Sequence, residues 1–155
     1  MRIVQIVPQI ANESSGPSHS VPSLCKALSL QKVQVDLYTL SPAPTTMHFV
    51  NTKVFERSPG PIGSRLGFSP EMNAALHSAA KKADIMHTHS LWKMPNVYPK
   101  NAIRNTSCKL IISPRGTLSE WSLSHHKWRK KIFNFLGQRQ ALLNAHCIHA
   151  TCDAE

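Results

Sequence analysis

The amino-acid sequence predicts a doubly wound α/β fold, in which a mainly parallel sheet carries helices on both faces. Short apolar runs alternate with segments of helical periodicity along the whole chain, as in repeated β-α-β units. The first apolar run, residues 3–7, has a single polar break, which is typical of a strand buried on both faces of a parallel sheet. The 155 residues and the 41% hydrophobic content suit a single domain with a sizeable core.

The first half of the chain continues this pattern after a loop at residues 8–17. Apolar residues at helical spacing predict a helix over residues 18–31 that packs one stripe on the sheet. Residues 33–40 predict a second strand, and residues 49–55 predict a weaker third after a turn-rich stretch. Residues 57–68 hold so many Gly and Pro residues that we expect a mobile surface loop there instead of regular structure.

The second half of the chain predicts further helices and strands in alternation. Ser69 followed by Pro70 is typical of a helix start, and the apolar spacing after it predicts a helix that ends near Ala83. The other expected elements are helices over residues 95–105 and 127–143 and strands over residues 85–89, 109–113 and 147–151. This alternation favours a Rossmann-like sheet, whose ligands bind beyond the carboxyl ends of the strands.

Charge is the most unusual feature of the composition. Lys and Arg number 18 against 8 Asp and Glu, which gives a formal net charge of +10. Such a surface attracts phosphates, whether they belong to a nucleic acid, a sugar nucleotide or an anionic lipid. No window approaches the roughly 18 consecutive apolar residues of a membrane span, and the N-terminus lacks the long apolar region of a signal peptide. We therefore expect a cytoplasmic protein.

The cysteines show no metal-binding or disulfide pattern. Cys25, Cys108, Cys147 and Cys152 form no C-x-x-C pair, and each lies in a segment that reads as helix or strand. We interpret all four as small buried apolar residues rather than as zinc ligands or disulfide partners. No metal or cofactor is predicted.

Loops that follow the predicted strands carry candidate site residues. In Ser15-Gly16-Pro17, the glycine would let backbone N–H groups approach an anion at a helix start, although a plain turn has the same pattern. His87 and His89 alternate along a strand, which puts both on one face with His89 nearer the ligand edge. An HxH pair can bind a metal, but no third ligand is apparent, so we favour a hydrogen-bonding role.

Arg115 and Gly116 follow the strand predicted at residues 109–113. They place a cation and a flexible residue where a phosphate or a sugar hydroxyl could bind. A solvent-exposed arginine explains the pattern equally well.

The segment after Ser124 has the pattern of a basic amphipathic helix. Its apolar stripe, which we expect to face the core, holds Trp128, Ile132, Phe135 and Leu136. That arrangement leaves Phe133 among the outer contacts. A solvated face on an ordinary core-packing helix is one interpretation, and contact with an anionic membrane surface is the other. The residues expected at such a surface are Lys127, Arg129, Lys130 and Lys131.

Four segments match, in order, the motifs of one known family. They are MRIVQIVP with SGPSHSVPSLCKAL, then ADIMHTHSLW, IISPRGTLSEWSL and IHATCDAE. Over essentially its whole length the chain resembles the N-terminal domain of bacterial family 4 glycosyltransferases, which have the GT-B fold. The resemblance implies that residues 1–155 are the acceptor-side, Rossmann-like half of such an enzyme.

The resemblance also implies roles for single residues. His89 would lie near the acceptor and the transferring sugar, and Arg115, where many members have His, would meet the donor sugar or phosphate as the second catalytic residue. Gly16 would approach the donor diphosphate. The substrate-binding residues implied are Ser15, Gly16, Pro17, His87, Ser90, Trp92, Gly116 and Glu120. The chain departs from the family at Ser15, which replaces the first Gly of a Gly-Gly pair, and at Ser90, which replaces the Gly after the second His.

The function implied by the resemblance is retaining transfer of a sugar from a nucleotide diphosphate sugar to a lipid-linked saccharide. The expected setting is envelope polysaccharide synthesis (O-antigen, capsule or exopolysaccharide) at the inner face of the cytoplasmic membrane, without a bound divalent metal. In such enzymes a second domain binds the nucleotide through a Glu-x7-Glu segment, which does not occur in these 155 residues. Residues 151–155 resemble the start of a further helix. We therefore expect a truncated chain that is inactive alone.

Two other functions fit the composition. A non-catalytic basic α/β module that binds nucleic acid or a nucleotide would carry aromatic residues on a strand platform, whereas Trp and Phe fall mainly after Ser124 here. No nucleic-acid partner is therefore expected. A flavodoxin-like nucleotide-binding protein would have a complete phosphate loop after the first strand, and Ser15-Gly16-Pro17 matches one poorly.

Overall fold

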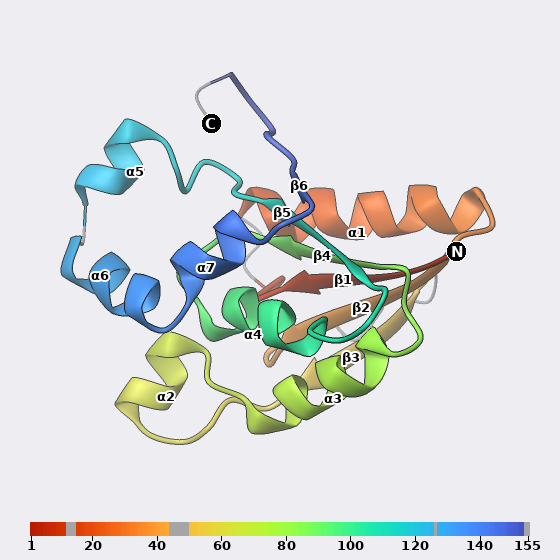
Figure 1. The fold of residues 1–155 in the computed structure, drawn as a ribbon, viewed down its shortest axis with the longest axis horizontal. Coiled ribbons are helices and arrows are strands. Elements are labelled where there is room, and N and C mark those ends of the chain that lie inside the picture. The colour runs from red at the N-terminus through yellow and green to blue at the C-terminus, as the bar shows by residue number, and fades with distance from the viewer. Residues whose placement is uncertain (12–14, 44–49, 126, 154–155) are drawn as a thin grey trace.

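A six-stranded parallel sheet forms the centre of the computed structural model. The structure describes residues 1–11, 15–43, 50–125 and 127–153, without the side chain of Arg129. The strand order is β3-β2-β1-β4-β5-β6, and every neighbouring pair is parallel (Figure 1). The strands are β1 (Arg2–Val7), β2 (Gln34–Leu40), β3 (Asn51–Phe55), β4 (Ile85–His89), β5 (Lys109–Ser113) and β6 (Cys147–Ile148). This arrangement confirms the predicted doubly wound α/β fold.

Strand β1 lies inside the sheet between β2 and β4, as its apolar sequence predicts. Its residues pair in register with both neighbours, for example Ile3 with Val35 and Ile85. Five of its six residues are buried. The last strand, β6, is shorter than expected, because its ladder ends where the His149 N–H donates to the Ile112 carbonyl (2.8 Å).

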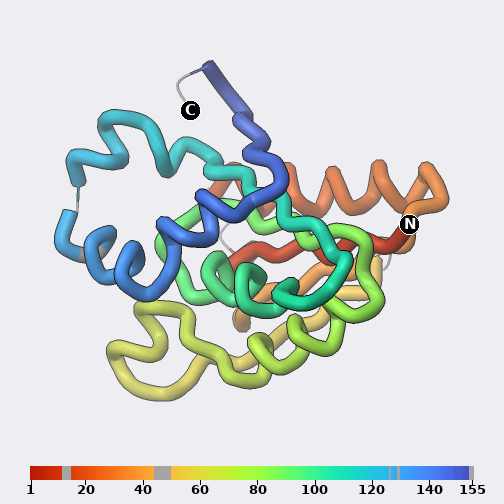
Figure 2. Tube along the Cα trace, viewed as in Figure 1, coloured from red at the N-terminus to blue at the C-terminus, as the bar shows by residue number. Residues whose placement is uncertain are grey.

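Helices cover both faces of the sheet (Figures 1 and 2). Helix α1 (Gly16–Leu30) packs on one face through Val21 and Cys25, against Val7 and Leu37. The opposite face is covered by α3 (Pro70–Ala80), α4 (Met94–Ala102) and α7 (Gln138–Leu143). As predicted, the Ser69 side chain caps α3 by accepting from the Met72 N–H. Among the described residues, no helix has both the length and the apolar character needed to cross a membrane.

The expectation of an irregular loop over residues 57–68 was wrong, because helix α2 (Pro61–Leu66) lies there. Its Gly and Pro residues stand mainly at the helix ends. Gly60 precedes the helix, Pro61 opens it, and Gly67 ends it in the left-handed conformation with φ 68°. Proline suits the first position of a helix and glycine the position after its end, so these residues delimit the helix instead of preventing it.

The single helix expected over residues 127–143 was also wrong. Helix α6 (Lys127–Phe135) ends before Gly137, whose φ of 114° is incompatible with a continuous helix, and α7 begins at Gln138. A short helix that the sequence did not predict, α5 (Glu120–Ser124), precedes α6. Helices α5 and α6 project from one end of the sheet, with α2 beside α6 (Figure 1).

The apolar stripe expected on α6 does not face the core. Phe133, which was assigned to the outside, is fully buried, whereas Phe135 is 92% exposed and Trp128 is 65% exposed. The helix is nine residues long, ends before the turn at Gly137, and packs through Phe133 instead of through the longer stripe.

The cysteines divide into two buried and two exposed residues. Cys25 and Cys108 are buried, and burial raises the pKa of their thiols to about 12 and about 11. Cys147 and Cys152 are exposed, so the expectation that all four are buried was wrong for these two. Cys147 lies on the short edge strand β6, and an edge strand is covered on fewer sides than a central one.

Candidate functional site

The candidate site lies where β1, β4 and β5 end, on the face of the sheet that carries α1. His87 and His89 lie on the same face of β4, with ring centroids 4.1 Å apart. Both side chains are buried, and His89 is fully so. Gln5 pairs in register with His87 and is buried beside them. Three polar side chains therefore lie side by side in the interior of the sheet.

Both ring nitrogens of His89 have partners, which determines its tautomer. Nε2 lies 2.7 Å from the amide oxygen of Gln5, an atom that can only accept, so Nε2 carries the hydrogen. Nδ1 is then the acceptor for the Arg115 guanidinium at 3.3 Å. Burial first, and then the nearby His87, Arg115 and His149, hold the pKa of His89 well below its ordinary value. The ring is neutral at pH 7.

Ser113 joins His87 to a third histidine. Its Oγ lies 2.8 Å from His87 Nε2 and 2.8 Å from Nδ1 of His149, which follows β6. A hydroxyl donates one hydrogen and accepts others, so it can serve both rings. Burial, followed by the charges of His149 and Arg115, lowers the pKa of His87 to about 4. Within the described ranges no group of three or more His, Cys, Asp or Glu residues is arranged to hold a metal ion.

Arg115 connects this cluster to the start of α1. Its guanidinium donates to Ser20 Oγ at 2.9 Å, and Ser20 Oγ in turn donates to the Gly16 carbonyl at 2.9 Å. A positive charge is thereby held between β4 and the first turn of α1. The N-terminus of a helix carries a further partial positive charge, so the two together favour an anion.

Gly16 occupies a position where the fold itself does not require glycine. It is exposed, its φ is not positive, and a Cβ built on it meets nothing within 4 Å. Ser15 is the N-cap residue, and Pro17 lies in the first turn, where proline is tolerated. The open space at Gly16 is consistent with the close approach of a ligand to the backbone.

Backbone strain is concentrated at this edge. Of the five non-glycine residues with positive φ in the described part of the chain, three lie here: Ser90 (68°), Trp92 (65°) and Arg115 (58°). Such conformations are costly and cluster at functional sites. Ser90 takes the left-handed conformation that favours glycine, and its N–H donates to the Ser113 carbonyl at 2.8 Å.

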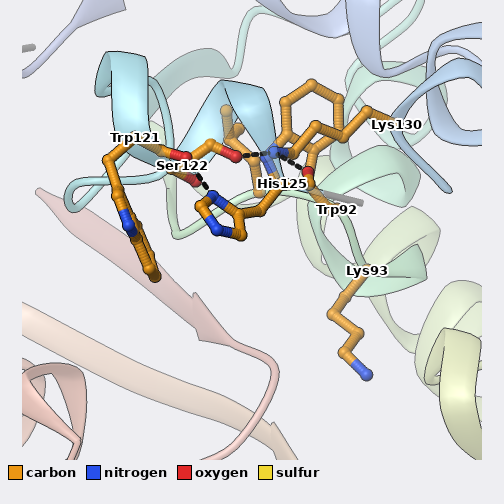
Figure 3. A pocket seen from close by; sticks show the side chains of 7 residues that line it. Trp92, Lys93, Trp121, Ser122, His125 and Lys130 are labelled. Atoms are coloured by element: carbon orange, nitrogen blue, oxygen red, sulfur yellow. Dashed lines mark hydrogen bonds between the residues drawn. The ribbon is translucent and has the colours of Figure 1, made fainter. Parts of the chain in front are cut away.

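A cavity of about 310 Å³ lies beside this edge, between the loop after β4 and helices α5 and α6 (Figure 3). Trp92, Trp121, His125 and Lys130 are among its lining residues. Lys130 donates to the carbonyl oxygens of Ser122 and His125, and its Nζ lies 5.9 Å from the centre of the Trp92 ring. Lys130 was expected at a membrane surface; in the structure its ammonium group donates to these two carbonyls.

The structure brings together some of the predicted site residues and leaves others apart. His89, Arg115 and Gly16 belong to one chain of hydrogen bonds, and the ring of His87 lies against that of His89. Gly116 forms the turn after Arg115 with φ 77°. Glu120 is exposed at the start of α5 and does not line the cavity. Lys127 and Lys131 are exposed on α6, and the side chain of Arg129 lies outside the description.

Sequence reasoning missed four members of this neighbourhood: Gln5, Ser20, Ser113 and His149. Gln5 stands out as the one polar residue in the first apolar run, and the other three lie within segments that resemble the family motifs without being singled out. The other three are ordinary polar residues until the fold places them beside a histidine or an arginine.

Comparison with known proteins identifies a family and solved structures of similar fold. A family model described as "Glycosyl transferase 4-like domain" matches residues 15–155. No curated protein matches the sequence. The structure is similar to sucrose-phosphate synthase from Thermosynechococcus elongatus, with a TM-score of 0.59, 14% identity, and coverage of 96% of this chain and 42% of that one. A short-chain dehydrogenase/reductase from Burkholderia vietnamiensis, at 12% identity over 98% of this chain and 84% of its own, has a lower TM-score of 0.46.

Proposed function

Because the chain belongs to the glycosyl transferase 4-like domain family, we propose that it is the acceptor-side domain of a retaining glycosyltransferase that uses a nucleotide diphosphate sugar. The chain spans 42% of the sucrose-phosphate synthase whose fold it shares. This proportion supports a two-domain enzyme in which residues 1–155 form one half and a second domain binds most of the nucleotide. On this proposal the chain has little activity by itself.

The observation that carries the proposal is the cationic group held at the start of α1. Arg115 is positioned from two sides, by Ser20 and by the neutral ring of His89. When the sugar leaves its nucleotide, negative charge develops on the diphosphate, and a preorganised cation beside a helix N-terminus stabilises that charge. In the proposed mechanism, Arg115 and the backbone at Gly16 provide this stabilisation.

In this proposal His89 is a positioning residue for Arg115. Its ring is fully buried, and its Nδ1 faces the guanidinium. A neutral imidazole with a fixed tautomer can accept from the arginine without repelling it. A direct contact with the transferring sugar would require the arginine to move aside.

We further propose a lipid-linked saccharide as the acceptor, in envelope polysaccharide synthesis at the inner face of the cytoplasmic membrane. The net charge of +10 and the exposed Lys127 and Lys131 support attraction to an anionic surface. The cavity at Trp92 and Trp121 combines apolar ring faces with polar groups, as small-ligand pockets commonly do. It is the proposed location of the acceptor saccharide.

The nucleic-acid alternative has less support. A single-strand binding platform exposes aromatic rings on strands. Here the strand aromatics Tyr38 and Phe55 are buried, and among the described residues the most exposed aromatic rings belong to α5 and α6.

The proposal is tested by replacing Arg115 with Ala in the two-domain protein. We expect kcat to fall on the order of a hundredfold, because loss of one preorganised charge-stabilising group has about that effect. Arg104→Ala is the matched control, since Arg104 is an exposed arginine at the opposite end of the β4–β5 connection. Equal kinetics in both variants would reduce Arg115 to a structural residue.

A further inference from the structure

An apolar groove between α2 and α6 shares no lining residue with the cavity beside the carboxyl edge. It has a volume of about 310 Å³ and is lined by Ile62, Arg65, Leu66, Trp128, Ile132 and Phe133. We call it the α2–α6 groove. Phe133 is fully buried, whereas Ile62 and Trp128 are mostly exposed. All lining residues except Arg65 are apolar, so the groove is suited to an apolar ligand.

Large apolar side chains also continue beyond the groove along α6. Trp128, Ile132 and Phe135 follow one another at helical spacing and are 65%, 41% and 92% exposed. Contiguous exposed apolar surface on a soluble domain marks a site of interaction with a partner or a membrane.

Cations border this apolar surface. Lys127 and Lys131 lie four residues apart on α6, each directly before a residue of the apolar stripe, and both are exposed. Arg65 borders the groove from α2. In the sequences of α2, α5 and α6 the one acidic residue is Glu120, at the start of α5. The face therefore combines exposed aromatic rings with positive charge.

We propose that the α2–α6 groove docks on an anionic phospholipid surface, with an acyl chain in the groove and Arg65, Lys127 and Lys131 at the lipid phosphates. Aromatic residues are enriched at the membrane–water interface, and basic amphipathic helices bind in its plane. A protein partner fits less well, because lysine is depleted from protein–protein interfaces.

This inference deepens the proposed function, since it rests on an acceptor that is attached to a lipid. It also replaces the sequence-based assignment of the membrane contacts. Lys130 turns inward and Phe133 is buried, so the apolar contacts are Trp128, Ile132 and Phe135, together with Ile62 of a helix that the sequence did not predict.

The test measures binding of the 155-residue chain to phosphatidylcholine vesicles with and without phosphatidylglycerol. We expect binding to the anionic vesicles, with quenching of tryptophan fluorescence by lipids brominated on their acyl chains. The double variant Trp128→Ser, Phe135→Ser should bind at least about tenfold more weakly, because each aromatic ring loses apolar burial. Leu30→Ser is the control, since Leu30 is an equally accessible apolar residue (73% exposed) at the C-terminal end of α1.

A second pair of variants separates specific cations from total charge. Lys127→Gln, Lys131→Gln should weaken binding, whereas Lys81→Gln, Lys82→Gln, which removes the same charge from exposed residues at the end of α3, should have little effect. Ile62→Ser tests the groove from its other side. Circular dichroism verifies that each variant is folded.

Several outcomes would overturn the proposal. Equal vesicle binding by wild type and the Trp128, Phe135 variant would do so, as would absence of acyl-chain quenching. A third such outcome is a wild type that does not bind vesicles but self-associates, with the self-association lost in the Trp128, Phe135 variant. That result would assign the face to a second copy of the chain. Vesicle binding does not depend on sugar transfer, so failure of this inference and failure of the proposed function can be distinguished by comparison with the Arg115→Ala kinetics.

Discussion

At the scale of single residues, a chain of hydrogen bonds joins the first turn of α1 to the centre of the sheet. It runs from Gly16 through Ser20 and Arg115 to His89 and Gln5. Each member restrains the next, so the guanidinium is held in one orientation before any ligand arrives. Preorganisation of this kind is what makes a charged group effective in stabilising a transition state.

The role proposed for Gly16 predicts opposite effects on stability and activity. Gly16→Ala should leave the free energy of unfolding unchanged or raise it by about 0.5–1 kcal/mol, because its backbone conformation suits alanine and the new methyl group has free space. The same methyl group should hinder the approach of the donor diphosphate and lower kcat/KM of the two-domain protein. Urea denaturation and transfer kinetics measure the two effects.

Gly137→Ala serves as the control for that experiment. At φ 114° an alanine is strained, so this variant should lose stability. If Gly16→Ala kept full activity, the proposed contact between Gly16 and the diphosphate would be wrong.

The buried histidines predict a fall in stability at mildly acid pH. The pKa of His87 is about 4 in the folded protein and about 6.5 in the unfolded chain. Between these two values the unfolded state binds a proton that the folded state does not, so the free energy of unfolding decreases as pH falls from about 6.5 to about 4. For His87 alone the loss is about 3 kcal/mol, and His89, whose pKa is also lowered, acts in the same direction.

Urea denaturation at a series of pH values measures this effect. His87→Gln should flatten the dependence on pH, because glutamine takes up no proton. His77→Gln, on the exposed surface of α3, is the control that leaves the buried cluster intact. A wild-type stability independent of pH over this window would contradict the burial of uncharged histidines.

At the scale of elements, α6 is the segment whose sequence and structure differ most. Its pattern predicts a long helix that packs through Trp128 and Ile132, but the helix ends at Phe135 and packs through Phe133. A stripe of apolar residues shows that a helix has an apolar face. It does not show whether that face meets the protein core or another surface.

Two phenylalanines on α6 should therefore differ strongly in their contribution to stability. Phe133→Ala should lower the free energy of unfolding by about 3–5 kcal/mol, because it leaves a cavity under a fully buried side chain. Phe135→Ala should change it by less than about 0.5 kcal/mol, because the ring is 92% exposed. Chemical denaturation measures both, and equal losses would contradict the packing of α6.

At the scale of the whole molecule, the carboxyl edge of the sheet brings the candidate site residues together. Parallel strands that end together bring His89, Ser113 and the start of α1 to the same edge, where ligands of doubly wound sheets bind. The proposed donor domain would face this edge, and the α2–α6 groove would remain free for a membrane.

If the second domain binds most of the nucleotide, the present chain should bind the donor weakly. Calorimetry with nucleotide diphosphate sugars should detect little binding to residues 1–155, and assays with the chain alone should detect no transfer. Tight binding of a sugar nucleotide to this chain would overturn the assignment of the acceptor-side half.

The sequence by itself determined the strands, most helices and the edge at which the candidate site lies. These are local properties, since the spacing of apolar residues and the Pro and Ser residues at helix starts depend on a few neighbouring positions. The strands at residues 85–89 and 109–113 were predicted to the residue, and the helices from Ser18 and Ser69 to within a few residues.

Only the tertiary structure decided which side chains meet. Gln5 lies 84 residues from His89, and Ser20 lies 95 residues from Arg115, so no local pattern contains these pairs. The same holds for α6, where packing chose Phe133 for the core and left Trp128 and Phe135 outside. The physical reason is that hydrogen bonding and burial at these positions depend on groups that chain folding brings together, whereas periodicity reports only what one segment can do alone.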